Sequence, residues 1–282
     1  MIVQCYLCNE TEFSHRKGSV RDNPELDILE CESCGLVTLS SLQHIKDNHY
    51  EESGMHGDDL PSVKSWAQGA ERDDERRFNL LKDTIVNAKI MDFGCGASGF
   101  ISKAESLARK VVGVEPEQRV HEYWKDRLEI YSSLKEVDDD FDLITAFHVV
   151  EHLPDPIAIL KSLAKCIKKG GRIVIEVPNS NDALLTLYDS NSFQNFTYWS
   201  QHLFLFNANN LQKLANQAGL RTVSIQQYQR YPLSNHLYWL SKNRGGGHIH
   251  WPFLDNPDLD NAYSASLASI GKCDTLIAYL EI

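Results

Sequence analysis

The chain has 282 residues, of which 42% are hydrophobic and 24% are charged, as expected for a globular protein with a sizeable core. No stretch approaches the roughly 18 apolar residues of a membrane-spanning helix, and residues 1–10 lack the basic start and apolar run of a signal peptide, so we expect a cytoplasmic protein with no membrane partner. The net charge of −11 argues against nucleic acid as the main partner, because phosphates call for a basic face.

Four N-terminal cysteines form two C-x-x-C pairs, Cys5–Cys8 and Cys31–Cys34. Each pair can lie on a tight turn with both sulfurs directed at one ion, and four thiolates are the tetrahedral set that zinc prefers. Because no position is left for water, we expect a structural zinc; the alternative is four unrelated buried or redox cysteines. We therefore predict a zinc-binding ribbon and linker at 1–60 and a larger domain at 61–282.

The next elements form a nucleotide-binding pattern. Residues 64–88 fit a helix, and residues 89–93 form a short apolar strand that runs into the loop Gly94-Cys95-Gly96-Ala-Ser-Gly99, with another helix after it. A G-x-G-x-x-G loop in this strand–turn–helix context indicates nucleotide binding. A second strand ends at Glu115, whose carboxylate can accept hydrogen bonds from both ribose hydroxyls. The loop alone fits a nicotinamide dehydrogenase, a flavoprotein or a methyltransferase.

Further motifs narrow this choice. Asp92 precedes the loop, a proline follows Glu115, and a strand at 141–147 leads into HVVEHLPDP. The segments DFGCGASGF, VVGVEP, FDLITAFHVVEHLPDP and KKGGRIVIEVPN resemble the class I S-adenosylmethionine-dependent methyltransferases over about residues 80–225, within the branch of ubiquinone-type and sugar methyltransferases. The resemblance implies an α/β fold: a Rossmann-like seven-stranded sheet with helices on both faces and a last strand inserted antiparallel beside the sixth. We place the last two strands at 221–228 and 273–281.

The same resemblance implies an S-adenosylmethionine site. The cofactor loop would be formed by Asp92, Gly94, Cys95, Gly96 and Gly99, the ribose would be held by Glu115, and His148 would lie at the carboxyl end of the fourth strand. The family often has an aspartate for the adenine after the third strand. Here the residues are Tyr-Ser132-Ser-Leu, so Ser132 or the backbone is expected to take that role.

A four-cysteine ribbon ahead of this domain resembles the zinc-ribbon sugar methyltransferases, which include deoxysugar C-methyltransferases. The segment CESCGLVTL matches their second zinc knuckle, and Trp199-Ser-Gln201-His202 stands where that family has Tyr-x-Glu-His, with the histidine as a proposed base. The tryptophan and glutamine, together with the lack of residues for that family's further C-terminal domain, favour methylation of a hydroxyl over a carbon. The expected acceptor is a nucleotide sugar or glycan precursor, in surface-polysaccharide or secondary-metabolite synthesis.

Three histidines are candidate bases, in the order His202, His148 and His152, because imidazole titrates near neutral pH. His202 could instead be a packed histidine within an aromatic lid, and Glu151 could simply cap the helix that follows it. The substrate-facing lid is predicted at about 181–206 and 229–271. Two other functions stay open: a methyltransferase that grips RNA or protein through the ribbon, and a non-catalytic scaffold. The acidic ribbon argues against RNA, and the complete glycine loop argues against a scaffold.

Overall fold

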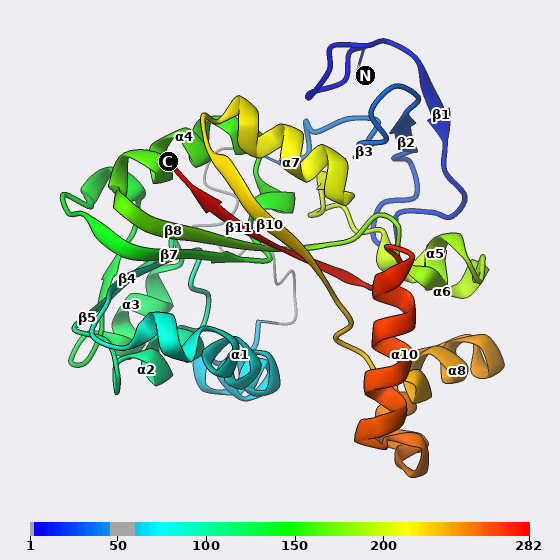
Figure 1. The fold of residues 1–282 in the computed structure, drawn as a ribbon. Helices are drawn as coiled ribbons and strands as arrows, with labels where there is room; N and C mark the ends of the chain where they lie inside the picture. The colour runs from blue at the N-terminus through cyan, green and yellow to red at the C-terminus, as the bar shows by residue number, and fades with distance from the viewer. Residues whose placement is uncertain (1–2, 46–59) are drawn as a thin grey trace.

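The computed structural model describes residues 3–45 and 60–282, and its larger part is built on a seven-stranded sheet (Figure 1). The strands lie in the order β10-β11-β8-β7-β4-β5-β6, with bounds β4 Lys89–Phe93, β5 Lys110–Val114, β6 Glu129–Tyr131, β7 Phe141–Phe147, β8 Ile167–Pro178, β10 Arg221–Tyr228 and β11 Thr275–Glu281. Strands β4 to β8 are parallel, whereas β11 is antiparallel to both β8 and β10. The predicted sheet and its antiparallel last strand are confirmed.

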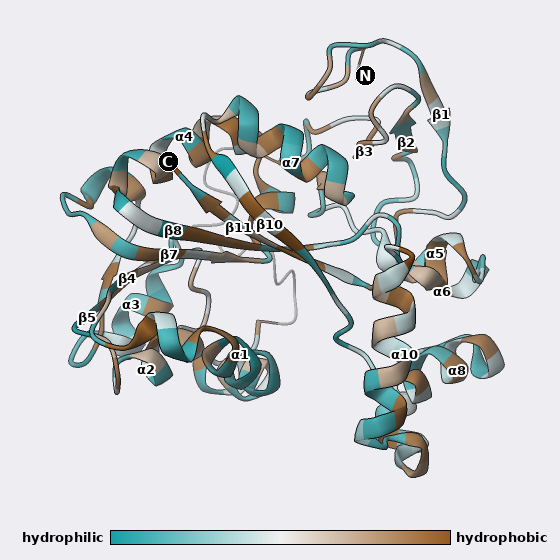
Figure 2. Cartoon of the chain, in the orientation of Figure 1, coloured by the Kyte–Doolittle hydropathy of each residue, from teal (hydrophilic) through white to brown (hydrophobic). Residues whose placement is uncertain are grey.

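Helices cover both faces of this sheet, as predicted (Figure 1). One face carries α1 Val63–Ile85, α2 Gly99–Ala104 and α3 Gln118–Trp124, and the other carries α4 Pro156–Cys166 and α7 Ala208–Gln217. The central strands are buried between these layers, so β7 and β8 are brown along much of their length in Figure 2. Such two-sided burial explains why apolar residues follow one another without alternation at 143–144 and 146–147 of β7 and at 173–175 of β8.

Local signals set the ends of these helices. Asp155 caps α4 by accepting a hydrogen bond of 3.1 Å from the backbone of Ala158, and Pro156 stands at the first helical position. Glu151 therefore does not cap this helix; it lies buried in the short 3-10 helix η2 (Val150–His152). Helix α7 begins with a capping box between Asn207 and Asn210.

The N-terminal ribbon forms a second sheet that a distant strand completes. Its strands are β1 Phe13–His15, β2 Ile28–Cys31 and β3 Val37–Leu39, and β3 pairs with β9 Phe204–Leu205. One continuous apolar core includes residues from both sheets. The ribbon is thus packed directly onto the larger part of the chain. Within the predicted linker, residues 46–59 lie outside the described part of the structure.

The two predicted lid segments fold into short helices beside the end of the large sheet (Figure 1). The first segment contains α5 Ala183–Thr186 and α6 Asn191–Thr197, and the second contains α8 Leu233–Lys242, α9 Gly247–His250, η3 Pro252–Leu254 and α10 Pro257–Ser269. The remaining 3-10 helix is η1, Leu134–Glu136. Among the described residues, no helix is both long and apolar enough to cross a membrane.

Candidate active site

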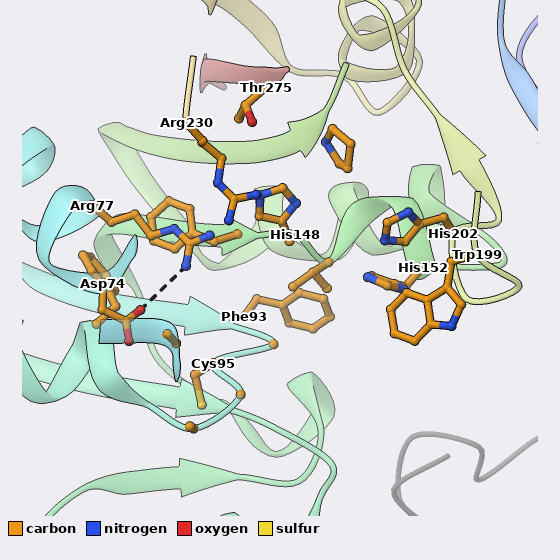
Figure 3. A pocket seen from close by; sticks show the side chains of 18 of the residues that line it. Asp74, Arg77, Phe93, Cys95, His148, His152, Trp199, His202, Arg230 and Thr275 are labelled. Atoms are coloured by element: carbon orange, nitrogen blue, oxygen red, sulfur yellow. Dashed lines mark hydrogen bonds and ion pairs between the residues drawn. The ribbon is translucent and has the colours of Figure 1, made fainter. Parts of the chain in front are cut away.

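A cavity of about 1210 Å³ lies along the carboxyl ends of the parallel strands, where ligands bind in open α/β sheets. Figure 3 shows how side chains from distant parts of the chain converge on it. Every residue that the sequence predicts for cofactor binding or catalysis lines this cavity: Asp92, Gly94, Cys95, Gly96, Gly99, Glu115, Ser132, His148, His152 and His202.

The glycine loop is shaped by close packing as well as by its turn. Gly94 has a φ of +70°, and a Cβ atom there would lie 2.5 Å from Val149 Cγ2. A Cβ atom on Gly99 would lie 2.1 Å from a carboxylate oxygen of Asp74 in α1. Larger residues at either position would therefore push the loop away from the segments that close the cavity.

Glu115 is held at the end of β5 by backbone donors. Its Oε2 accepts a hydrogen bond of 2.9 Å from the backbone N–H of Gly96, and its Oε1 accepts one of 3.2 Å from that of Glu117. Burial raises the pKa of Glu115 to about 7. The carboxylate is thus fixed beside the glycine loop, with its remaining lone pairs available to a ligand.

Asp92 and Ser132 differ in how strongly they are held. Asp92 is buried at the end of β4, accepts a hydrogen bond of 2.6 Å from Thr145 Oγ1, and has a pKa raised to about 7 by burial. Ser132 follows β6 and accepts a hydrogen bond of 3.1 Å from Gln118 Nε2. Asp92 is therefore fixed directly before the glycine loop, while Ser132 lines the cavity just after β6.

The structure adds buried charged residues that the sequence interpretation missed. Arg77 of α1 lies 3.6 Å from Asp74 and donates a hydrogen bond of 2.9 Å to Glu176, and its Nε is buried without a hydrogen-bond partner. Figure 3 shows the Arg77–Asp74 pair facing the glycine loop. A signal was present: positions 74 and 77 continue the helical stripe formed by Leu81 and Ile85, so both face inward.

Both ring nitrogens of His148 contact charged side chains. Its Nδ1 lies 3.0 Å from Glu151 Oε1, and its Nε2 lies 3.1 Å from both Glu176 Oε1 and Arg230 Nη1. Burial alone would lower the pKa of His148, but the contacts with Glu151 and Glu176 outweigh it and raise the pKa above the ordinary value. Both ring nitrogens of His148 are therefore occupied, and neither is placed to take a proton from the hydroxyl group of a methyl acceptor.

His152 and His202 lie together further along the cavity, beside Trp199 (Figure 3). Their ring centroids are 4.9 Å apart, and the ring of Trp199 lies 5.4 Å from that of His202. Burial, with the nearby His152, lowers the pKa of His202 to about 3, so its imidazole is neutral at pH 7. His202 Nδ1 is buried and has no hydrogen-bond partner within residues 3–45 and 60–282. Of the three predicted histidines, His202 is the one best placed to meet a substrate.

The four N-terminal cysteines converge outside the cavity. All four sulfurs lie within 4.8 Å of one another, with Cys5 and Cys34 at 3.5 Å and Cys8 and Cys31 at 3.4 Å. The two C-x-x-C turns thus present one compact set of sulfurs, and this donor set suits a tetrahedral zinc ion. Zinc binding by these residues stays a prediction.

Comparison with known proteins assigns this chain to a protein family. A family model described as a methyltransferase domain matches residues 66–225. The ubiquinone biosynthesis O-methyltransferase of Hydrogenovibrio crunogenus is 25% identical over 203 residues, which are 64% of this chain and 78% of that protein. The enzyme of the same name from Proteus mirabilis is 33% identical over 125 residues, so the match spans 37% of this chain and only 49% of that protein.

Solved structures share the fold. A crystal structure of an S-adenosylmethionine-dependent methyltransferase from Archaeoglobus fulgidus matches with a TM-score of 0.50 and 17% identity, over 75% of this chain and 94% of that one. At this identity the likeness shows the α/β architecture alone.

Proposed function

The chain belongs to the methyltransferase domain family, and from this premise we propose that it transfers the methyl group of S-adenosylmethionine to a hydroxyl group of a nucleotide sugar or glycan precursor. The sulfonium methyl group is already activated for displacement. Positioning of the acceptor oxygen in line with it can therefore supply about 7–11 kcal/mol of the barrier.

The cofactor end of the proposed site is the glycine loop. Glu115 would accept hydrogen bonds from the ribose hydroxyls, with Asp92 and the glycines shaping the loop and Ser132 near the adenine. Arg77 would face the amino-acid end of the cofactor, because it lines the cavity beside the glycine loop and its Nε has no hydrogen-bond partner among the described residues. That N–H could donate a charge-assisted hydrogen bond to the cofactor's carboxylate.

The proposed class of acceptor rests on one observation: aromatic rings and the guanidinium of Arg21 form one wall of the cavity near His202. The guanidinium of Arg21 lies 4.7 Å from the ring centroid of Trp199 and 5.3 Å from that of Phe196. Among the described residues, no carboxylate lies within ion-pair distance of Arg21. Phe193 and Trp239 extend this wall, with ring centroids 5.2 Å apart. The guanidinium of Arg21 donates a hydrogen bond of 3.4 Å to the backbone carbonyl of Phe196 but has no carboxylate partner among the described residues. Stacking surfaces beside such a guanidinium suit the base and diphosphate of a nucleotide sugar.

Arg21 comes from the ribbon, so the N-terminal module contributes to this wall. Its backbone N–H donates a hydrogen bond of 2.9 Å to Tyr198, and the next residue, Asp22, accepts two hydrogen bonds from Ser200. The Arg21→Ala variant is expected to raise KM for the nucleotide sugar about tenfold or more with little change in kcat, since a charged hydrogen bond contributes about 1.5–3 kcal/mol. Steady-state kinetics measures the split, and Arg21→Lys should recover part of the loss. An unchanged KM in Arg21→Ala would argue against an anionic acceptor.

His202 is the proposed catalytic residue on the acceptor side. Because its neutral imidazole faces the cavity and can hold the acceptor oxygen in position, the His202→Ala variant is expected to lose methyl transfer by about 100-fold or more. Its affinity for S-adenosylhomocysteine should equal that of the wild type. His248→Ala, which removes another cavity-lining histidine, is the matched control and should keep kcat. Equal losses in both variants would show that His202 has no special role.

A second acceptor class follows from the relatives, whose names refer to ubiquinone biosynthesis. A phenolic hydroxyl would also fit an aromatic wall, but it would leave Arg21 unused. The test is a panel of nucleotide sugars and substituted phenols, with release of S-adenosylhomocysteine as the readout. Turnover of nucleotide sugars alone supports the proposal, and turnover of phenols alone would replace it.

A further inference from the structure

We propose that Glu151, His152 and His202 bind a divalent metal ion at the acceptor end of the cavity, separate from the cysteine site. One ligand atom from each residue can be chosen so that all of them lie within 4.8 Å of one another. Small side-chain rotations would bring such atoms to the ligand spacing of a bound ion. Two imidazoles and a carboxylate are a donor set used by zinc and by other divalent first-row metals.

The backbone holds these three residues together. Glu151 and His152 belong to η2, which follows β7, whereas His202 lies in the turn just before β9. The backbone N–H of Leu203 donates a hydrogen bond of 2.8 Å to the carbonyl of Glu151, and the N–H of His202 donates one of 2.9 Å to Trp199. The two segments are therefore fixed against each other before any ion binds.

Two unsatisfied polar atoms point to a missing partner at this position. Glu151 has no solvent exposure; its Oε1 contacts His148, while its Oε2 is buried without a hydrogen-bond partner in the described part of the chain. Within the same described residues, His202 Nδ1 is also buried without a hydrogen-bond partner. Leaving a buried polar atom unpaired costs about 1–3 kcal/mol, and more for a charged group. A cation between the two would satisfy both.

His152 carries the support that metal-binding histidines usually have. Its Nδ1 lies 2.8 Å from the backbone carbonyl of Gln201, so this nitrogen carries the proton and donates it. The lone pair of the ring then lies on Nε2, which is 4.0 Å from Glu151 Oε1. A histidine ligand typically donates its other N–H to a carbonyl or carboxylate in this way, which fixes the orientation of the ring.

Among the residues that the structure describes, Glu151, His152 and His202 are the group of possible ligands at this position, so an ion held by them would keep an open position. His152 and His202 line the cavity, whereas Glu151 lies behind them, so a fourth ligand could enter from the cavity. Three protein ligands with one open position are typical of catalytic zinc sites. A role in catalysis rests on the proposed function: the acceptor hydroxyl would occupy the open position and lose its proton to water. Its oxygen would then form a bond to the methyl carbon as the bond from that carbon to sulfur breaks.

The number of zinc ions bound per chain tests the proposal, and this measurement needs no methyl-acceptor substrate. After equilibrium dialysis against micromolar free Zn²⁺, mass spectrometry of the metal should find two ions per wild-type chain and one in His202→Ala or Glu151→Gln. The control His248→Ala should keep two. A mercurial reagent, which displaces zinc from thiolates, should release only one of the two ions from the wild type.

Two results would overturn the proposal: a single zinc in the wild type that the mercurial releases completely, or a second zinc that persists in both His202→Ala and Glu151→Gln. Titration with S-adenosylhomocysteine, run on the same samples, separates this outcome from failure of the proposed function. Cofactor binding with only one zinc would leave the methyltransferase site intact and remove the second metal site alone.

Discussion

The Glu115→Ala variant is expected to lose affinity for S-adenosylhomocysteine by about 100-fold or more. Two hydrogen bonds from ribose hydroxyls to a carboxylate contribute about 1.5–3 kcal/mol each, and alanine removes both. The substitution also removes the acceptor for the backbone N–H of Gly96, which loosens the glycine loop. Isothermal calorimetry at pH 8 measures the difference.

The protonation of Glu115 supplies an internal control. Because burial raises its pKa to about 7, the carboxylate is present above that pH and is lost as the pH falls through it. Affinity for S-adenosylhomocysteine should therefore be flat above about pH 7 and fall below it, whereas Glu115→Gln should be weak at every pH and keep only the smaller change that Asp92, with its pKa of about 7, contributes. If Glu115→Ala bound as tightly as the wild type, the carboxylate would have no part in cofactor binding.

Loss of Cys31, a predicted zinc ligand, is expected to destabilise far more than the ribbon. Structural zinc contributes about 10–16 kcal/mol of binding free energy in small zinc-dependent folds. In this chain, strand β3 of the ribbon pairs with β9, directly after the turn that carries His202. We expect Cys31→Ser to lower Tm strongly and to weaken acceptor binding as well.

Differential scanning calorimetry and metal analysis check this prediction. Cys166→Ser is the matched control, because Cys166 is a half-buried thiol at the end of α4, outside the cysteine cluster. Its Tm and zinc content should stay close to the wild type. A Cys31→Ser protein with unchanged Tm would mean that the four sulfurs hold no structural ion.

The sheet could be predicted closely from the sequence because its signals are local. Strands β4 and β7 have the predicted bounds, since each is a mainly apolar segment followed directly by Gly94 or His148. The glycine loop and Glu115 were found for the same reason: their spacing along the chain sets their position at the edge of a parallel sheet.

The charged parts of the site were harder to predict. In α1 the run of charged residues reads as a solvated helix face, yet Asp74 and Arg77 are buried against the glycine loop and Glu176. The helical stripe indicates that positions 74 and 77 face inward, but it cannot identify the partner Glu176, which lies 99 residues from Arg77 along the chain. The pairing of β3 with β9 is a long-range contact of the same kind, and it brings Arg21 next to Trp199.

The cofactor assignment of the glycine loop is tested most directly by titration of the zinc-loaded wild-type protein with S-adenosylhomocysteine and, separately, with NAD⁺. We expect one S-adenosylhomocysteine to bind per chain with micromolar affinity, and no measurable binding of NAD⁺. Binding of NAD⁺ without S-adenosylhomocysteine, or of neither, would contradict the assignment of the glycine loop and Glu115 to methyl transfer.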